Sequence, residues 1–188
     1  GDYFSWMSHD DTYYPNKIKL QVKHLKEFGD RKVIPYSNYA IMNMFEDIER
    51  GFTIPNVYKN KPHYFLLQES LVGRTALIPK AAFNECGKYD VNLKTAYDYE
   101  LWQRMIQSGY EFTHQEAIFA RKRLYRTPST EEVNLAREEV QALVFKYLES
   151  FTPSERVLLD GSEYNFYVQN KVCLKNSNLP KVHECLDE

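Results

Sequence analysis

Two adjacent carboxylates are the first residues whose types and spacing suit chemistry. Ser8-His9-Asp10-Asp11 follows an aromatic segment, residues 2–7, which we predict to be a buried strand. Carboxylates at the carboxyl end of a strand lie where open α/β sheets bind ligands. Because close carboxylates repel each other unless a cation neutralises them, the pair suits Mg²⁺ or Mn²⁺ and, through it, a diphosphate. The alternative is a solvated turn that caps the next helix, which this tetrapeptide alone favours.

A third carboxylate, Asp98, lies in the first turn of a helix predicted over residues 97–108. The helix dipole keeps such a carboxylate ionised, as a general base requires, although simple charge complementation is the alternative. The basic run Arg121-Lys122-Arg123 suits phosphate oxygens. Taken alone, that run is better explained as a solvated loop.

The surrounding elements alternate between strands and helices. Pro15 begins a helix whose apolar stripe is Ile18, Val22, Leu25 and Phe28, and Gly29 ends it. Residues 40–63 lack a clear period and are predicted to be a loop. The other predictions are strands at 33–39, 75–78 and 111–121, and a short helix between Pro79 and Gly87.

The last sixty residues are predicted to be helical. Ser129-Thr130-Glu131-Glu132 matches a capping box, and apolar residues from Val133 to Leu148 then follow a helical period. Pro153 begins a further short helix, and a polar tail follows. An α/β body at 1–128 with a helical C-terminal extension at 129–188 is therefore expected.

Composition excludes several classes of protein. The chain has 188 residues, is 43% hydrophobic and carries a formal net charge of −2, so nucleic acid is not expected as a partner. Three scattered cysteines favour a reducing compartment over a disulfide framework. No apolar run reaches the length of a membrane-spanning helix. We therefore expect a cytoplasmic location, with the inner face of a membrane as an option.

The order of these motifs resembles the family-2 glycosyltransferases of the GT-A type. Residues 1–22, with Asp10, Asp11, Pro15 and Lys17, resemble the family's DxD segment. Residues 75–90 look like its strand, short helix and "GGFD" turn, and residues 97–110 are similar to its "EDydLWlRl…GY" helix. The resemblance covers about residues 1–125 and implies a GT-A-like fold.

The resemblance implies an inverting sugar transfer from a nucleotide-sugar donor, most simply UDP-linked, to a hydroxyl of a glycan or lipid-linked acceptor. Asp10 and Asp11 are the implied ligands of a divalent cation, Mn²⁺ or Mg²⁺, and Asp98 is the implied base. Ser8, His9 and Arg121 are the implied contacts to the donor diphosphate or sugar. Ser8 replaces the first Asp of DxD, Tyr97 replaces a Glu, and Arg123 replaces a His that is a possible third metal ligand.

The resemblance also implies that the N-terminal strands holding the nucleotide are missing. The fold is thus expected to be truncated, with self-association or an absent N-terminal segment completing the sheet. Two alternatives stay open. One is a non-catalytic structural or interaction fragment of such an enzyme. The other is a metal-dependent phosphoester hydrolase using Asp10 and Asp11, which would need further ligands.

Overall fold

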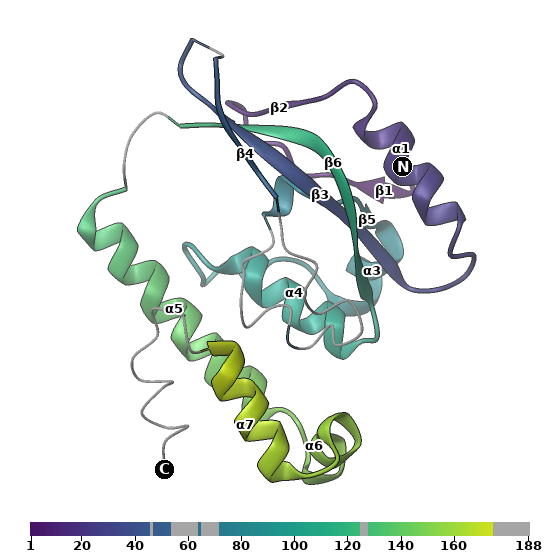
Figure 1. The fold of residues 1–188 in the computed structure, drawn as a ribbon, viewed down its shortest axis with the longest axis vertical. Helices are drawn as coiled ribbons and strands as arrows, with labels where there is room; N and C mark the ends of the chain where they lie inside the picture. Colours follow the sequence, from purple (N-terminus) through teal and green to yellow (C-terminus); the bar gives the residue numbers. More distant parts are fainter. Residues whose placement is uncertain (46, 54–63, 65–71, 125–127, 175–188) are drawn as a thin grey trace. The chain divides into compact units, whose positions relative to one another are not determined.

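The computed structural model describes residues 1–45, 47–53, 64, 72–124 and 128–174. They belong to two compact units, and each unit is built from segments that are not contiguous in the sequence. Figure 1 shows the helices and strands. The first comprises Gly1–Pro62, Leu71–Lys88 and Arg104–Thr127, and the second comprises His63–Ser70, Tyr89–Gln103 and Pro128–Glu188. The helical C-terminal segment therefore forms its unit together with two segments from the middle of the chain.

A four-stranded sheet organises the first unit. Its order is β2-β6-β3-β4, with β2 at Thr12–Tyr13, β3 at Val33–Met42, β4 at Ile48–Phe52 and β6 at Glu111–Arg123. The two long strands, β3 and β6, are parallel, and the outer strands pair with them in the antiparallel sense. Almost every residue of β3 is buried, as expected for a central strand covered on both faces.

Smaller elements lie beside this sheet. A two-stranded sheet pairs β1 (Tyr3–Phe4) with β5 (Ile78–Pro79), and η1 (Gly73–Thr75) precedes β5. The helix α3 (Lys80–Cys86) follows β5 and ends at Gly87, as predicted. The predicted strand at 2–7 is shorter than expected and is not buried, because Tyr3, Trp6 and Met7 are 41%, 43% and 52% exposed.

Helix α1 (Lys17–Lys26) corrects the predicted stripe. Ile18 is 42% exposed, whereas Lys17 and Gln21 are fully buried. The polar residues face inward because they find hydrogen-bond acceptors there. Lys17 donates to the carbonyl oxygen of Ala76 at 3.0 Å, and Gln21 donates to that of Thr75 at 2.8 Å. Satisfied hydrogen bonds thus outweigh the apolar pattern in orienting this helix.

The segment predicted as a loop at 40–63 contains a strand. β4 forms a hairpin with β3, and Asn43 stabilises its turn by accepting hydrogen bonds from the backbone N–H groups of Phe45 and Asp47 at 2.8 and 3.1 Å. Apolar and polar residues alternate only weakly in this segment because β4 lies at the edge of the sheet. The remainder of that prediction, residues 54–63, lies outside the described residues.

The second unit is helical. It contains residues 97–103 of α4 (Tyr97–Gln107), together with α5 (Thr130–Glu149), α6 (Pro153–Asp160) and α7 (Glu163–Leu174). Ser129 and Thr152 both form capping boxes. The capping box predicted at Ser129 is therefore confirmed. α7 corrects the prediction of a polar tail, since its residue Phe166 is fully buried. Among the described helices, none is both long and apolar enough to cross a membrane.

Candidate active site

The pairing of β2 with β6 brings two of the predicted motifs together. Thr12 pairs with Arg121, so the acidic turn at 8–11 lies beside the end of the basic run. The backbone N–H of Asp11 donates to the carbonyl oxygen of Ser8 at 3.2 Å and closes this turn. Residues that are more than a hundred positions apart in sequence therefore share one site in the first unit.

Asp11 is the buried member of the acidic pair. Its side chain is 2% exposed, and its Oδ2 lies 2.6 Å from Nε of Arg74. Its Oδ1 accepts a hydrogen bond from the backbone N–H of Arg123 at 3.2 Å. Burial raises the pKa of this carboxyl, and the charge of Arg74 opposes the rise. One oxygen of Asp11 thus accepts a hydrogen bond from the backbone, and the other lies in an ion pair with Arg74.

Asp10 has different surroundings. A hydrogen bond from the Ser8 side chain lowers the pKa of its carboxyl, and the charges of His9 and Arg74 act in the same direction. Its Oδ1 is sheltered from solvent and has no hydrogen-bond partner. Lys122 also interacts electrostatically with this carboxylate, although burial lowers the pKa of its amine. An ionised carboxylate with an unsatisfied oxygen beside cationic groups is the arrangement expected where a cation and a diphosphate bind together.

Arg123 ties the acidic turn to the β3–β4 hairpin. Its Nε donates to the backbone carbonyl of Asp10 at 3.1 Å, and its Nη1 donates to the carbonyls of Asn43 and Met44 at 3.3 and 3.1 Å. Arg121 instead places its guanidinium over the ring of Tyr14, 4.9 Å from the centroid. The two arginines of the basic run are therefore held by the protein in different ways.

Arg74 of this site was not predicted from the sequence, and neither was the burial of the nearby Lys17. Arg74 pairs with Asp11, yet nothing around it in the sequence marks it as a partner. Lys17 is fully buried, and its Nζ donates to Ser5 Oγ at 2.7 Å and to Gln21 Oε1 at 2.8 Å. Burial lowers the pKa of this amine to about 7. Lys17 belongs to the DxD-like segment of the sequence, and its four-residue spacing from Gln21 puts both side chains on one helix face.

Asp98 lies in the second unit. Its Oδ1 accepts a hydrogen bond from the N–H of Tyr99 at 2.8 Å, in the first turn of α4. Glu139 of α5 accepts hydrogen bonds from the backbone N–H groups of residues 94–96, immediately before that turn. Burial, followed by the charge of Asp98, raises the pKa of Tyr89 to about 12. The predicted base is thus a carboxylate in the first turn of α4. Glu139 of α5 binds the backbone immediately before that turn.

A metal ion at this site would draw its protein ligands from the carboxylates present. In the part of the chain that the structure describes, no group of three or more His, Cys, Asp and Glu side chains is arranged to hold a metal ion. A hydrolase using Asp10 and Asp11 would need such a set. One carboxylate is nevertheless compatible with Mg²⁺ or Mn²⁺ that takes its other ligands from water and substrate phosphates. The unsatisfied Oδ1 of Asp10 fits that kind of site.

Comparisons with known proteins place these features in context. The chain is 32% identical to an uncharacterized glycosyltransferase of Rickettsia typhi and 31% identical to one of Rickettsia prowazekii, in each case over 98% of this chain and 59% of the relative. The chain is similar to glycosyltransferases along almost its whole length. It spans about three fifths of the length of these relatives. No protein-family model matches the sequence.

A solved structure gives independent information about the fold. The structure of residues 1–349 of S. aureus TarS, in complex with UDP-GlcNAc, matches with a TM-score of 0.58 at 11% identity. The match covers 98% of this chain and 49% of the TarS chain. This chain shares the α/β fold of the matched part of TarS.

Proposed function

We propose that this chain is the catalytic portion of a glycosyltransferase of the GT-A type, family 2. It moves a sugar from a nucleotide-sugar donor to a hydroxyl of a glycan or lipid-linked acceptor. The observation that carries the proposal is the Asp10 carboxylate, whose Oδ1 is sheltered without a hydrogen-bond partner and which lies near the charges of Arg74 and Lys122. It lies in a fold shared with a protein whose structure contains UDP-GlcNAc, which supports a UDP-linked donor.

In this proposal, Asp10 would hold a divalent cation, Mn²⁺ or Mg²⁺, together with the donor diphosphate. That ion would neutralise negative charge on the departing diphosphate. Asp11 keeps Asp10 in place, because its ion pair with Arg74 and its hydrogen bond from the N–H of Arg123 fix the end of the turn. Lys122 adds positive charge for the phosphate oxygens. Ser8 and His9 contribute by keeping Asp10 ionised.

Asp98 is the proposed general base. Its carboxylate takes the proton of the acceptor hydroxyl as the acceptor oxygen bonds to the anomeric carbon. The bond between that carbon and the diphosphate oxygen breaks in the same step, so one displacement inverts the configuration. Proton removal by a positioned carboxylate contributes typically ~10²–10⁴-fold to rate. Asp98 lies in the first turn of α4, where the helix dipole favours a negatively charged side chain.

Calorimetric titration of UDP into the chain, with and without Mn²⁺, tests the donor site. We expect Mn²⁺-dependent binding that is at least tenfold weaker in Asp10→Asn and unchanged in Asp30→Asn, a control at an exposed aspartate outside the site. An assay of UDP release from UDP-GlcNAc then tests Asp98→Asn, which should bind UDP normally and lose turnover. Absence of UDP binding by the unaltered chain would refute the proposal in favour of a non-catalytic module.

A further inference from the structure

The buried amine of Lys17 joins three segments of the first unit to α1. Its Nζ donates to Ser5 Oγ at 2.7 Å, to Gln21 Oε1 at 2.8 Å and to the carbonyl oxygen of Ala76 at 3.0 Å. The same nitrogen lies 4.5 Å from the centroid of the Tyr13 ring. The end of β1, the strand β2 and the segment between η1 and β5 therefore meet at one nitrogen atom.

Each of these segments is attached to the acidic turn. Ser5 precedes the turn by three residues and Tyr13 follows it by two, and their hydroxyl oxygens are 2.9 Å apart. Ala76 follows Arg74 by two residues, and Arg74 forms the ion pair with Asp11. The chain entering the turn, the chain leaving it and the segment that supplies its ion-pair partner are thus all tied to this nitrogen.

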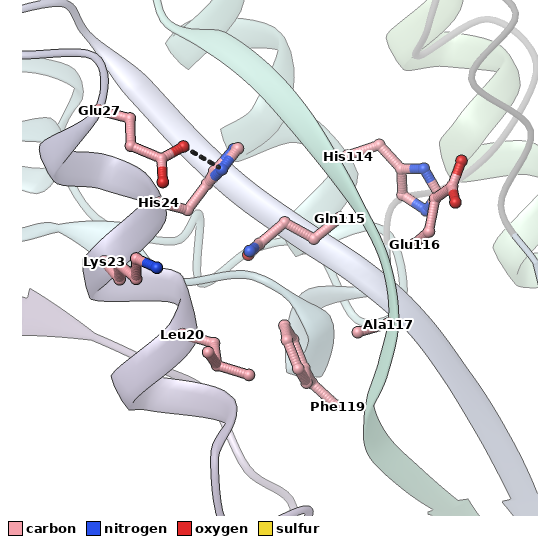
Figure 2. Close-up of a pocket in the computed structure, with 9 residues that line it drawn as sticks. All are labelled: Leu20, Lys23, His24, Glu27, His114, Gln115, Glu116, Ala117 and Phe119. Carbon is pink, nitrogen blue, oxygen red and sulfur yellow. Dashed lines mark ion pairs between the residues drawn. The ribbon is translucent and has the colours of Figure 1, made fainter.

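Lys17 lies out of reach of a bound ligand. Its exposed fraction is 0%, and it is not among the residues that line the groove between α1 and β6 (Figure 2). Other residues of the helix line that groove, namely Leu20, Lys23, His24 and Glu27. The amine can therefore act on a bound donor only through the segments that it holds.

A lysine is an unusual choice for a position that solvent does not reach. An apolar side chain of similar length would fill the space without the cost of removing an ammonium group from water. The hydrogen bonds at this position offset that cost only in part, since burial still lowers the pKa of Lys17 to about 7. The amine therefore lowers the stability of the fold, which indicates a role other than filling the core.

We propose that Lys17 is a positioning residue of the donor site, an assignment that rests on the proposed glycosyl transfer. Its ammonium group holds the acidic turn in the shape that presents the Asp10 carboxylate to the cation and the diphosphate. An ammonium group has three N–H donors, one for each of its three acceptors, and its charge attracts the Tyr13 ring. A neutral amine has one donor fewer and no charge, so it holds the turn less firmly.

The protonation of this amine can be followed because its neighbours do not titrate near neutral pH. Tyr13 on β2 is in contact with the amine, and burial raises the pKa of its hydroxyl, so it keeps its proton. Gln21 on α1, Ser5 after β1 and the carbonyl of Ala76 do not ionise. Arg74 on η1 stays charged at every pH used.

Calorimetric titration of UDP with Mn²⁺ at pH 6 and pH 8.5 tests the proposal. Lys17→Met fills the same space without donors, and at pH 6 its affinity should be about tenfold lower than that of the unaltered chain, about the effect of one hydrogen bond to a charged group. At pH 8.5 the difference should shrink to about threefold or less, because the unaltered amine is then largely neutral. Comparing the two chains at each pH cancels the titration of UDP and of His9. Lys19→Met, at an exposed lysine of the same helix, should match the unaltered chain throughout.

A second variant and a second measurement make the test independent of Lys17→Met and of UDP. Ser5→Ala keeps the buried amine but removes its contact to the chain entering the turn, and should lower affinity roughly threefold at pH 6. Amide hydrogen exchange reports on the turn without any ligand. The N–H of Asp11, which donates to the carbonyl of Ser8, should lose about tenfold of its protection in Lys17→Met, while Ile34 in the centre of the sheet keeps its own.

The outcomes separate this inference from the proposed function. Absence of UDP binding by the unaltered chain would refute the proposed function, and hydrogen exchange would still decide whether Lys17 holds the turn. Equal affinity of Lys17→Met and the unaltered chain at pH 6, or a difference that is the same at both pH values, would overturn the inference. Unchanged protection of Asp11, or an equal loss of protection at Ile34, would overturn it as well, because Lys17 would then have no specific effect on the turn.

Discussion

The carboxylate of Glu139 should be a major source of stability in the second unit. It accepts hydrogen bonds from the N–H groups of Lys94, Thr95 and Ala96 at 2.9, 2.8 and 2.9 Å, and from the Thr95 hydroxyl at 2.6 Å. Burial alone would raise its pKa, but the Thr95 hydroxyl and the backbone N–H groups outweigh burial and lower the pKa to about 2. These interactions fasten α5 to the segment that leads into α4 and Asp98.

The magnitude follows from that pKa. Each unit of displacement is worth ~1.36 kcal/mol, so a fall from 4.5 to about 2 sets an upper bound of about 3 kcal/mol. Because Glu139 is partly exposed and solvent screens it, we expect about 1–2 kcal/mol of folding stability. The pKa is lower in the folded state, so this stability is present above pH 4.5 and is lost as the pH falls toward 2.

Urea unfolding of Glu139→Gln, followed by the fluorescence of the buried Trp102, measures this contribution. At pH 7 the midpoint should fall by roughly 0.5–1 M relative to the unaltered chain. The neighbouring exposed residue provides the control Glu138→Gln, whose midpoint should not change. The gap between the unaltered chain and Glu139→Gln should narrow between pH 5 and pH 3. Equal midpoints for the two variants at pH 7, or a gap independent of pH, would refute the reasoning.

Three further substitutions test the first unit. Burial lowers the pKa of Lys17 to about 7, so the free energy of unfolding should rise by about 1–3 kcal/mol between pH 7 and 9. Urea titrations of Lys17→Met should show no such dependence on pH. Asp11→Asn leaves Arg74 without its charge partner and should cost about 2 kcal/mol, measured by thermal unfolding. Arg123→Lys keeps the charge but cannot donate to both the acidic turn and the β3–β4 hairpin, so the affinity for UDP with Mn²⁺ should fall about tenfold in calorimetry. Unchanged affinity would show that the hydrogen bonds of Arg123 do not position Asp10.

Local signals in the sequence predicted many elements well. The capping box at Ser129, the helix between Pro79 and Gly87, and α4 are confirmed because each depends on residues a few positions apart. α1 was assigned the wrong buried face because its orientation depends on distant acceptors. The carbonyls of Thr75 and Ala76 accept hydrogen bonds that stabilise a buried glutamine and a buried lysine. No pattern within the helix reveals these two acceptors.

The acidic pair shows the same division between local and distant information. Adjacent carboxylates indicated a candidate site, but they did not distinguish the surroundings of Asp10 from those of Asp11. That distinction comes from Arg74, which approaches from a segment sixty residues away, and from the N–H of Arg123 on β6. The relation of Asp98 to a helix start could be predicted, whereas its support by Glu139 depends on the packing of α5.

The presence of Arg123 in place of a histidine has a consequence for how the proposed site would work. A guanidinium stays protonated and has no lone pair to offer a metal ion, so this position cannot supply a ligand. It instead contributes positive charge and three hydrogen bonds that hold the acidic turn against the hairpin. With Asp11 engaged by Arg74, the protein offers a cation mainly the carboxylate of Asp10. A cation held by one carboxylate needs the oxygens of a diphosphate to complete its coordination, so each of the two ligands should raise the affinity for the other by the same factor.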